Sequence, residues 1–180
     1  MSLRNRVGGA YALATFTLLC VPACTAQDIS IPRSICDTPV EQKLTAPLLK
    51  PTGELSEWHT AGRGGKETSV CIISVDKSEA LRFRFAWHTD TIDPMDYSSL
   101  DNSVTGLWEP RRVSHLAESA TLGDNGAIAT TRCEDRGKWH FTLALKVTRD
   151  QKIVHQRNEI EQFMRAYMPA TMKAVGCTHP

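Results

Sequence analysis

Two stretches of the chain alternate apolar and polar side chains with the two-residue period of a half-buried β-strand. In the first, Leu81, Phe83, Phe85 and Trp87 alternate with Arg82, Arg84, Ala86 and His88. In the second, Trp139, Phe141, Leu143, Leu145 and Val147 alternate with His140, Thr142, Ala144, Lys146 and Thr148. Residues 68–75 and 127–133 predict a partner strand before each, joined by a turn at 76–78 and a loop at 134–138. The pattern therefore predicts two β-hairpins.

A helix is predicted near the start of this region. Thr38 suits the N-cap, Pro39 the first helical position and Glu41 the capping-box partner. An apolar stripe at four-residue spacing follows, formed by Val40, Leu44 and Leu48. Pro47 is expected to end or kink this helix.

A second helix is predicted at the C-terminal end, capped by Asp150. Its apolar positions include Ile153, Ile160, Met164, Tyr167 and Met168. Pro169 is expected to kink or split it, and Gly176 suits its C-terminal cap. Runs of strands with helices at the ends predict an α+β fold. We expect an antiparallel sheet built from two hairpins, with the N-terminal and C-terminal helices packed on one face.

The remaining segments are less regular. Residues 54–60 suit an edge strand, and residues 61–66, with three glycines, suit a loop. The stretch 89–126 contains turn sequences at 93–96 and 124–126. Within it, residues 113–122 predict a short helix that carries His115.

The N-terminus has the pattern of an export signal. Arg4 and Arg6 precede an apolar run over residues 10–21, which ends in small residues up to Ala26. The run is shorter than the ~20 residues that a membrane-spanning helix needs. We therefore expect a signal at 1–26, a short leader at 27–35 and one disulfide-braced domain at 36–180, located outside the cell or in the cell envelope.

The number of cysteines is compatible with signal-peptide cleavage at either of two positions. A cut after Ala26 leaves four cysteines, and a cut before a lipidated Cys24 also leaves four that can pair. Cys24 follows Ala23 as a lipobox requires, although Cys20 and Pro22 depart from the usual lipobox residues. Secretion and lipid anchoring to the outer face of the cytoplasmic membrane are thus both retained.

The four remaining cysteines allow three connectivities. We predict Cys36–Cys71 and Cys133–Cys177, because each pair ties a predicted helix end to a predicted strand in the same half of the domain. Two such disulfides would add ~3–4 kcal/mol each in the chain-entropy model.

Composition narrows the function classes. The formal net charge is +1, which argues against nucleic acid as the main partner. No catalytic or cofactor-binding motif is present, since Gly62–Gly65 matches neither a phosphate loop nor a dinucleotide fingerprint. We expect no cofactor, and contact with a membrane only through a lipid anchor at Cys24. The most suitable function is non-enzymatic binding of an envelope protein or a small ligand.

One cluster suggests chemistry. His88, Asp90, Asp93, Asp96 and Asp101 are weak candidates for a cation site, although their spacing fails the EF-hand pattern. Ordinary turn chemistry accounts for the same residues. The first alternative function is accordingly a small hydrolase that uses His88 with a nearby aspartate, and it requires the two in one concave pocket. The second is a protease inhibitor that presents the loop 61–66.

The four tryptophans divide by their positions. Trp87 and Trp139 fall on the apolar stripes of their strands and are expected in the core. Trp58 and Trp108 lie in irregular segments and are expected at the surface. A binding protein should show an exposed apolar patch near one of these two.

Residues 35–39 and 49–53, together with 81–88 and 93–96, give the chain a family resemblance. The sequences Ile-Cys-Asp-Thr-Pro and Leu-Lys-Pro-Thr-Gly, then Leu-Arg-Phe-Arg-Phe-Ala-Trp-His and Asp-Pro-Met-Asp, stand at these positions. In them the chain resembles small secreted or lipid-anchored actinobacterial proteins of unknown function. The resemblance implies export and paired cysteines, and it carries over no catalytic residue.

Overall fold

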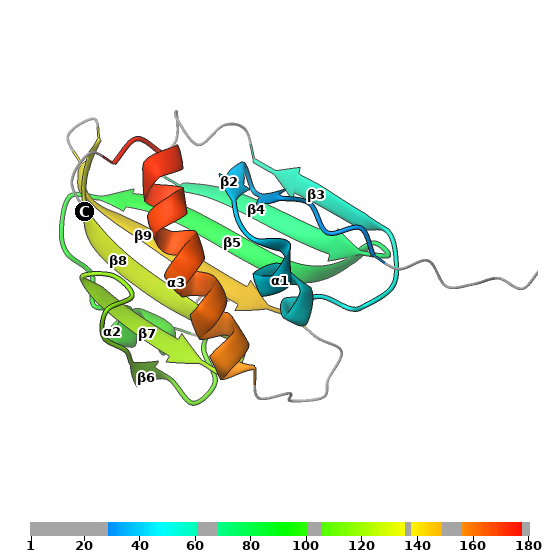
Figure 1. The fold of residues 1–180 in the computed structure, drawn as a ribbon. Coiled ribbons are helices and arrows are strands. Elements are labelled where there is room, and N and C mark those ends of the chain that lie inside the picture. Colours follow the sequence, from blue (N-terminus) through cyan, green and yellow to red (C-terminus); the bar gives the residue numbers. More distant parts are fainter. Residues whose placement is uncertain (1–28, 61–67, 101–105, 136–137, 149–155, 178–180) are drawn as a thin grey trace, which may run out of the picture.

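The computed structural model describes residues 29–60, 68–100, 106–135, 138–148 and 156–177. Its centre is a seven-stranded antiparallel sheet with the strand order β3-β4-β5-β9-β8-β7-β6 (Figure 1). The strands are β3 (Leu55–His59), β4 (Thr68–Val75), β5 (Ser78–His88), β6 (Arg111–Arg112), β7 (Ser119–Gly123), β8 (Gly126–Asp135) and β9 (Lys138–Val147). The antiparallel sheet predicted from the alternating pattern is confirmed.

The two predicted hairpins, β4–β5 and β8–β9, form the middle of the sheet, where β5 pairs with β9. Val75 pairs with Ser78, so Asp76 and Lys77 form a two-residue turn. Both have positive φ, 52° and 64°, as the tight hairpin turn that matches strand twist requires. The edge strand expected at 54–60 is also present, as β3.

The helix predicted at 113–122 is wrong, because this part of the chain contains β7, paired with β8. Ala120 and Leu122 belong to the core on one face of the strand, and Thr121 is fully buried on the other. Ser119 and Thr121 do alternate with Ala120 and Leu122, but the run is too short for this period to identify a strand. His115 lies before the strand in a left-handed conformation, with φ 59°.

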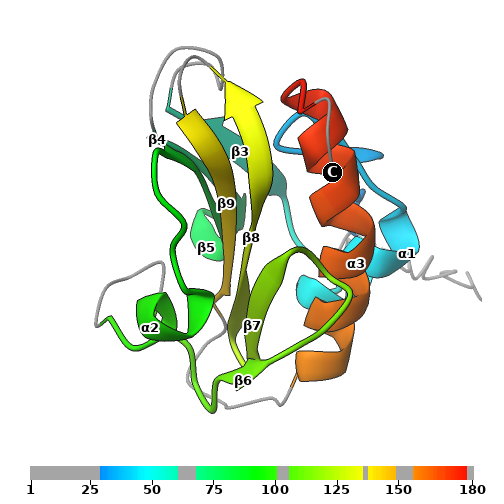
Figure 2. The same cartoon turned by 90° about the vertical axis from the view of Figure 1, so that its left-hand side faces the viewer.

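The C-terminal helix α3 (Arg157–Ala174) is confirmed, and it lies across one face of the sheet. The short helix α2 (Pro94–Ser98) lies against the opposite face (Figure 2). Apolar residues of α3 enter the core at spacings of three and four residues, among them Ile160, Phe163, Met164 and Tyr167. Asp150 and Ile153, predicted to begin this helix, lie outside the described residues.

Pro169 does not split α3, which continues through it to Ala174. A proline in a helix leaves the carbonyl four residues earlier, here that of Arg165, without its usual donor. Arg165 and Pro169 are both on the exposed side of the helix, where water can satisfy that carbonyl. Gly176 caps the helix as predicted, with φ 82°.

The N-terminal helix is not present as predicted. Thr38 and Pro39, expected to begin it, form strand β2 (Thr38–Pro39), which pairs with β1 (Ser34–Ile35). A helical turn, α1 (Gln42–Thr45), follows and passes into the 3₁₀ segment η1 (Ala46–Leu48). The capping pattern was misleading because Thr38 is fully buried, with its hydroxyl 3.3 Å from that of Thr171 on α3.

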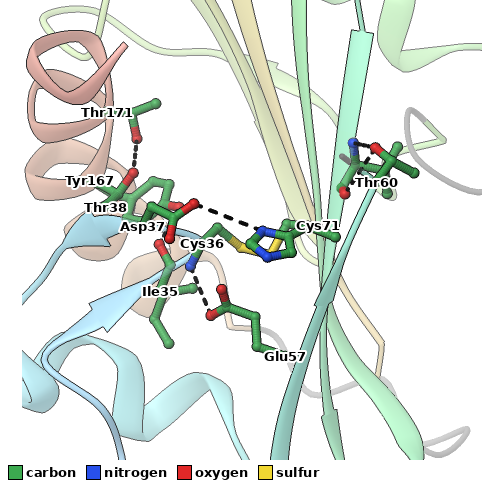
Figure 3. The surroundings of a disulfide bond; sticks show 11 residues. Ile35, Cys36, Asp37, Thr38, Glu57, Thr60, Cys71, Tyr167 and Thr171 are labelled. Carbon is green, nitrogen blue, oxygen red and sulfur yellow. Dashed lines mark hydrogen bonds and ion pairs between the residues drawn. A yellow bond between two sulfur atoms is a disulfide. The ribbon is translucent and has the colours of Figure 1, made fainter. Parts of the chain in front are cut away.

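Both disulfides have the predicted connectivity, Cys36–Cys71 and Cys133–Cys177. The first joins the β1–β2 turn to β4, next to Glu57, whose carboxylate accepts a hydrogen bond from the Cys36 N–H at 3.0 Å (Figure 3). The second joins β8 to the end of α3. There the Cys177 N–H donates to the Met172 carbonyl at 2.9 Å, and the Gly176 N–H donates to Lys173 at 3.2 Å. These two hydrogen bonds form the Schellman motif, and they fix the position of Cys177 at the end of the helix.

The disulfides indicate an oxidising, non-cytoplasmic compartment. None of the helices in the described part of the chain has the length and apolar character needed to cross a membrane. Cys20, Cys24 and the rest of the predicted signal lie outside the described residues.

Candidate functional site

The strands at one side of the sheet expose a face that no described helix covers. On β3, β4 and β5, alternate residues lie on the face away from α3. On that face, α2 packs mainly against β7 and β8. We call this surface the open sheet face. It consists of Trp58, Val70, Ile72, Arg82 and Arg84.

The strand register brings these side chains together. Trp58 lies opposite Ile72, and Ile72 opposite Arg82, so the three form one row across β3, β4 and β5. In the next row, Val70 lies opposite Arg84. Side chains opposite each other on one face of an antiparallel pair have Cβ atoms about 4.5–5.5 Å apart. The face therefore combines an aromatic ring, two aliphatic side chains and two guanidinium groups.

The residues that alternate with these side chains along β4 and β5 determine which side chains lie on the open sheet face. Cys71 and Ile73 of β4, and Phe83 and Phe85 of β5, are buried on the helix side. Because strand side chains alternate, burying this set directs Val70, Ile72, Arg82 and Arg84 to the opposite side. A shift of one residue would expose the aromatic core, so the position of the two arginines is tied to the stability of the fold.

The two arginines differ in their partners. The Arg82 Nε donates to the Glu79 carboxylate at 2.9 Å, and this pairing raises the pKa of Arg82. Arg84 has no hydrogen bond or ion pair among the described residues, although it is partly buried in the middle of the sheet. A guanidinium has five donors that match a carboxylate or a phosphate. Arg84 is therefore free to bind an anionic group presented to this face.

Aromatic exposure follows the predicted positions only in part. Trp87 is buried at 6% exposure, while Trp58 is 57% exposed and Trp108 is 50% exposed, as expected. Trp139, expected in the core, is 48% exposed, so that prediction is wrong. It stands at the start of β9, beyond the Trp87–Phe141 ring contact. The alternation of apolar residues along β9 thus continues to Trp139, one step of the alternation beyond the last aromatic ring in the core.

His88 ends β5, directly opposite His140 on β9. The His140 Nε2 lies 3.1 Å from the hydroxyl oxygen of Thr91. Among the other histidines, His59 Nδ1 lies 3.8 Å from Asp37, and His155 lies outside the described residues. The structure therefore gathers two histidines at one end of the sheet, a pairing that sequence alone did not indicate.

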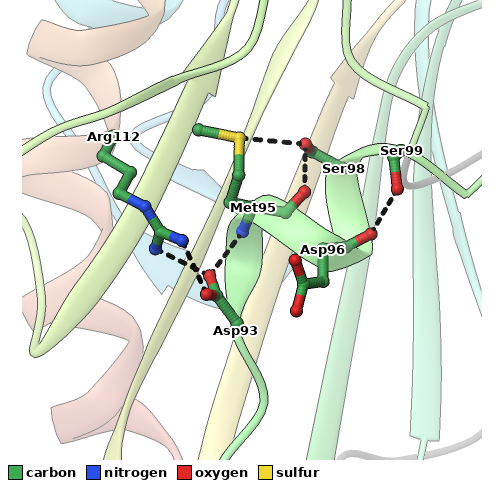
Figure 4. A network of polar contacts seen from close by, with 6 residues as sticks. All are labelled: Asp93, Met95, Asp96, Ser98, Ser99 and Arg112. Atoms are coloured by element: carbon green, nitrogen blue, oxygen red, sulfur yellow. Dashed lines mark hydrogen bonds and ion pairs between the residues drawn. The ribbon is translucent and has the colours of Figure 1, made fainter.

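The aspartates proposed with His88 have separate positions. Asp93 caps α2 by accepting from the Met95 N–H at 2.9 Å, and it forms a two-bond ion pair with Arg112 at 2.8 and 2.6 Å (Figure 4). Asp96 lies on α2, and Asp90 accepts from the Thr89 hydroxyl at 3.4 Å. Asp101 is outside the described residues. The expected turn chemistry at 93–96 is thus the start of a helix.

No group of three metal-binding side chains that includes His88 or these aspartates occurs in the described part of the chain. One such group, Cys36, Glu57 and Cys71, does lie together there. Its two sulfur atoms form the first disulfide, which removes the thiolates that a metal would need.

A surface groove of about 630 Å³ lies beside α3, on the opposite side of the sheet from the open face. Its lining residues are Arg33, Pro39, Val40, Glu41, Gln42, Lys43 and Ala166. It contains no histidine, so it is not the pocket that the hydrolase hypothesis requires. The loop 61–66, which the inhibitor hypothesis requires, is outside the described residues.

Sequence reasoning did not single out Arg84. The signal was present, because the alternation over 81–88 places Arg82 and Arg84 on the wetter side of their strand. What was missing was the register, which sets Arg84 beside Val70 and brings Trp58 to the same face.

Comparison with protein-family models, with curated proteins and with solved structures finds no match for this chain.

Proposed function

We propose that this chain is an exported cell-envelope protein that binds an acidic segment of a partner protein through the open sheet face, without catalysis. Export is supported by the signal pattern over residues 1–26 and by the two disulfides, which need an oxidising compartment to persist. Release after Ala26 and lipid anchoring at Cys24 both place the domain outside the cytoplasmic membrane.

The observation that carries the binding proposal is Arg84. A guanidinium without a described partner, set between apolar side chains in the middle of a sheet, is desolvated more than a surface arginine and gains more from an anionic partner. Arginine and tryptophan are the residues most enriched among those that dominate protein interfaces. Trp58 supplies the ring, two strands away on the same face.

The partner's chemistry follows from the charges. Arg82 and Arg84 lie two residues apart on the same face of β5, and the one carboxylate paired with them in the described residues is Glu79. An incoming carboxylate therefore meets a net positive surface, with Val70, Ile72 and Trp58 beside it to receive apolar side chains. A peptide segment that alternates acidic and apolar residues has the pattern that fits this face.

The test is an NMR titration of the disulfide-intact chain from residue 27 onward with a short peptide of alternating glutamate and leucine. We expect amide shifts confined to β3, β4 and β5. Arg84→Glu should weaken binding by about tenfold or more. Lys173→Glu makes the same change of charge at an exposed position on α3, and it should leave binding unchanged.

Two further variants separate the tryptophans. Trp58→Ser should weaken binding, and Trp139→Ser, a matched loss of an exposed ring, should not. If the shifts map elsewhere, or if Arg84→Glu and Lys173→Glu behave alike, the open sheet face is not the binding surface. A peptide of alternating lysine and leucine should give no shifts at this face.

A further inference from the structure

The two edges of the sheet are built differently. One edge, β6, is two residues long and consists of Arg111 and Arg112. Short length and repeated positive charge are the devices by which natural proteins prevent edge pairing. The other edge, β3, has five residues, Leu-Ser-Glu-Trp-His, with no lysine, arginine, proline or glycine. β3 therefore has neither the short length nor the positive charges that protect β6.

The backbone groups on the outer edge of β3 can be identified from the register. The Thr60 N–H donates to the Val70 carbonyl, and the Asp76 N–H donates to the Glu54 carbonyl. Residues 54 and 60, and by alternation Ser56 and Trp58, thus exchange bonds with β4. The main-chain groups of Leu55, Glu57 and His59 point outward and have no partner among the described residues.

We propose that β3 pairs antiparallel with β3 of a second copy of this chain, with a two-fold axis at Trp58. In this register, Glu57 and the second copy's His59 form a hydrogen-bonded pair, and the reciprocal pair forms on the other side of the axis. Each carboxylate then faces an imidazole, which can donate to it. The two Trp58 rings meet at the axis in the closely spaced type of pair.

Neighbouring registers are less suitable. Moving the axis to Glu57 sets two carboxylates directly opposite, which is destabilising, and moving it to His59 sets two imidazoles opposite. The axis at Trp58 is the position near the strand centre that pairs unlike groups and also brings the two rings together. The match of an imidazole donor to a carboxylate acceptor therefore selects a second copy in one register.

The side chains on the helix side do not close this edge. Glu57 accepts from the Cys36 N–H, and His59 lies 3.8 Å from Asp37. Both contacts come from the β1–β2 turn, which carries Cys36 and Asp37 (Figure 3). The outward main-chain groups of β3 lie in the plane of the sheet, as ladder hydrogen-bonding groups do. Ser56, Glu57, Trp58 and His59 are all exposed.

A two-fold axis perpendicular to the sheet keeps the same face of both copies on the same side. The two open sheet faces would then form one continuous surface with the Trp58 pair at its centre. Both proposals involve Trp58, but the register of this pairing depends on Glu57 and His59 and not on Arg84, so either proposal can fail without the other.

The test combines sedimentation velocity with amide hydrogen exchange on the disulfide-intact chain from residue 27 onward. We expect a dimer that dissociates on dilution, and Glu57 and His59 amides that are protected in the dimer and exchange rapidly after about a hundredfold dilution. A monomer at all concentrations, or protection of these amides that does not depend on concentration, would overturn the proposal.

A charge exchange tests the register. Glu57→Lys and His59→Glu should each weaken self-association, because the first removes the carboxylate that accepts from His59 and the second sets two carboxylates opposite each other. A mixture of the two variants should associate at least tenfold more tightly than either alone, since the introduced lysine then faces the introduced glutamate. Absence of that rescue, with both variants folded and oxidised, would contradict this register. Glu57→Gln, which keeps an acceptor for Cys36, checks that loss of that contact is not the cause.

Discussion

The Tyr167 hydroxyl donates a hydrogen bond to the Ile35 carbonyl oxygen across 2.9 Å, which joins α3 to the β1–β2 hairpin inside the core. Both residues are fully buried, and they are 132 positions apart in the chain. The Tyr167 ring also stacks on Phe163 and contacts Phe83 of β5. One side chain thus connects the N-terminal segment, the C-terminal helix and the sheet.

Tyr167→Phe should lower the free energy of unfolding by about 0.5–1.5 kcal/mol, because it keeps the ring contacts and removes the buried hydrogen bond from the hydroxyl to the Ile35 carbonyl. Denaturant unfolding followed by circular dichroism measures this. Tyr97→Phe is the matched control, since the Tyr97 hydroxyl has no hydrogen bond among the described residues. Equal effects of the two changes would mean that the Tyr167 hydroxyl is not a stabilising donor.

Lys77→Gly should stabilise the protein by up to about 1 kcal/mol. Lys77 has φ 64° in the β4–β5 turn, a conformation that costs a residue with a side chain and favours glycine. Thermal unfolding provides the measurement, and Lys77→Ala provides the control, because alanine has the same restriction as lysine. A gain for alanine as large as that for glycine would point to the charge rather than to the backbone.

Removal of the second disulfide by the paired changes Cys133→Ala and Cys177→Ala should cost about 4 kcal/mol in the chain-entropy model, since it closes a loop of 44 residues. Because Cys177 follows the helix cap, amides in the last turn of α3 should lose protection first in hydrogen exchange. Removing Cys36 and Cys71 should cost a similar amount without that local effect. Loss of protection at the α3 end in both variants would argue against the local tether.

The Asp93–Arg112 ion pair should make the free energy of unfolding depend on pH in the acidic range. The hydrogen bonds from Arg112, followed by that from the Met95 N–H, hold the pKa of Asp93 below its ordinary value of 3.8. A carboxyl whose pKa is lower in the folded state stabilises the fold above its ordinary pKa, and the contribution is lost as pH falls through the folded value. Unfolding measurements between neutral and strongly acidic pH should therefore show wild type and Asp93→Asn converging in acid.

The control for that experiment is Asp90→Asn, which removes an exposed carboxylate that has no arginine partner in the described residues. Its stability should follow that of the wild type across the whole range. If Asp93→Asn also follows the wild type at neutral pH, the ion pair with Arg112 contributes nothing measurable to folding.

Strands that have one face in the core and one outside were predictable, because their alternation survives in the sequence. This holds for β5 from Leu81 to Phe85, where Arg82 and Arg84 lie on the other face from the buried rings. The period of β9 also survives in the sequence, although Thr142 and Ala144 are buried as well, because small or polar residues fill its second face. The same reasoning found the disulfide pairs, since each joins segments of one half of the domain. It failed for β7, because the alternation of Ser119 and Thr121 with Ala120 and Leu122 spans too few residues to identify a strand.

Other errors arose where tertiary contacts outweigh local signals. Thr38 resembles a helix cap, yet its hydroxyl lies beside that of Thr171 and its backbone belongs to a hairpin. Trp139 continues an apolar stripe beyond the point where the core ends. The open sheet face could not be predicted, because Trp58 and Arg84 are brought to one surface only by the pairing of three strands.

Intact-mass analysis of the native protein, isolated separately from the culture medium and from the membrane fraction, tests the central claim most directly. We predict a chain that begins at Gln27, or at a lipid-modified Cys24, and whose mass is lower by the four hydrogen atoms that two disulfides remove. A native chain that retains residues 1–23, or one that carries Cys36, Cys71, Cys133 and Cys177 as free thiols, would contradict export to an oxidising compartment.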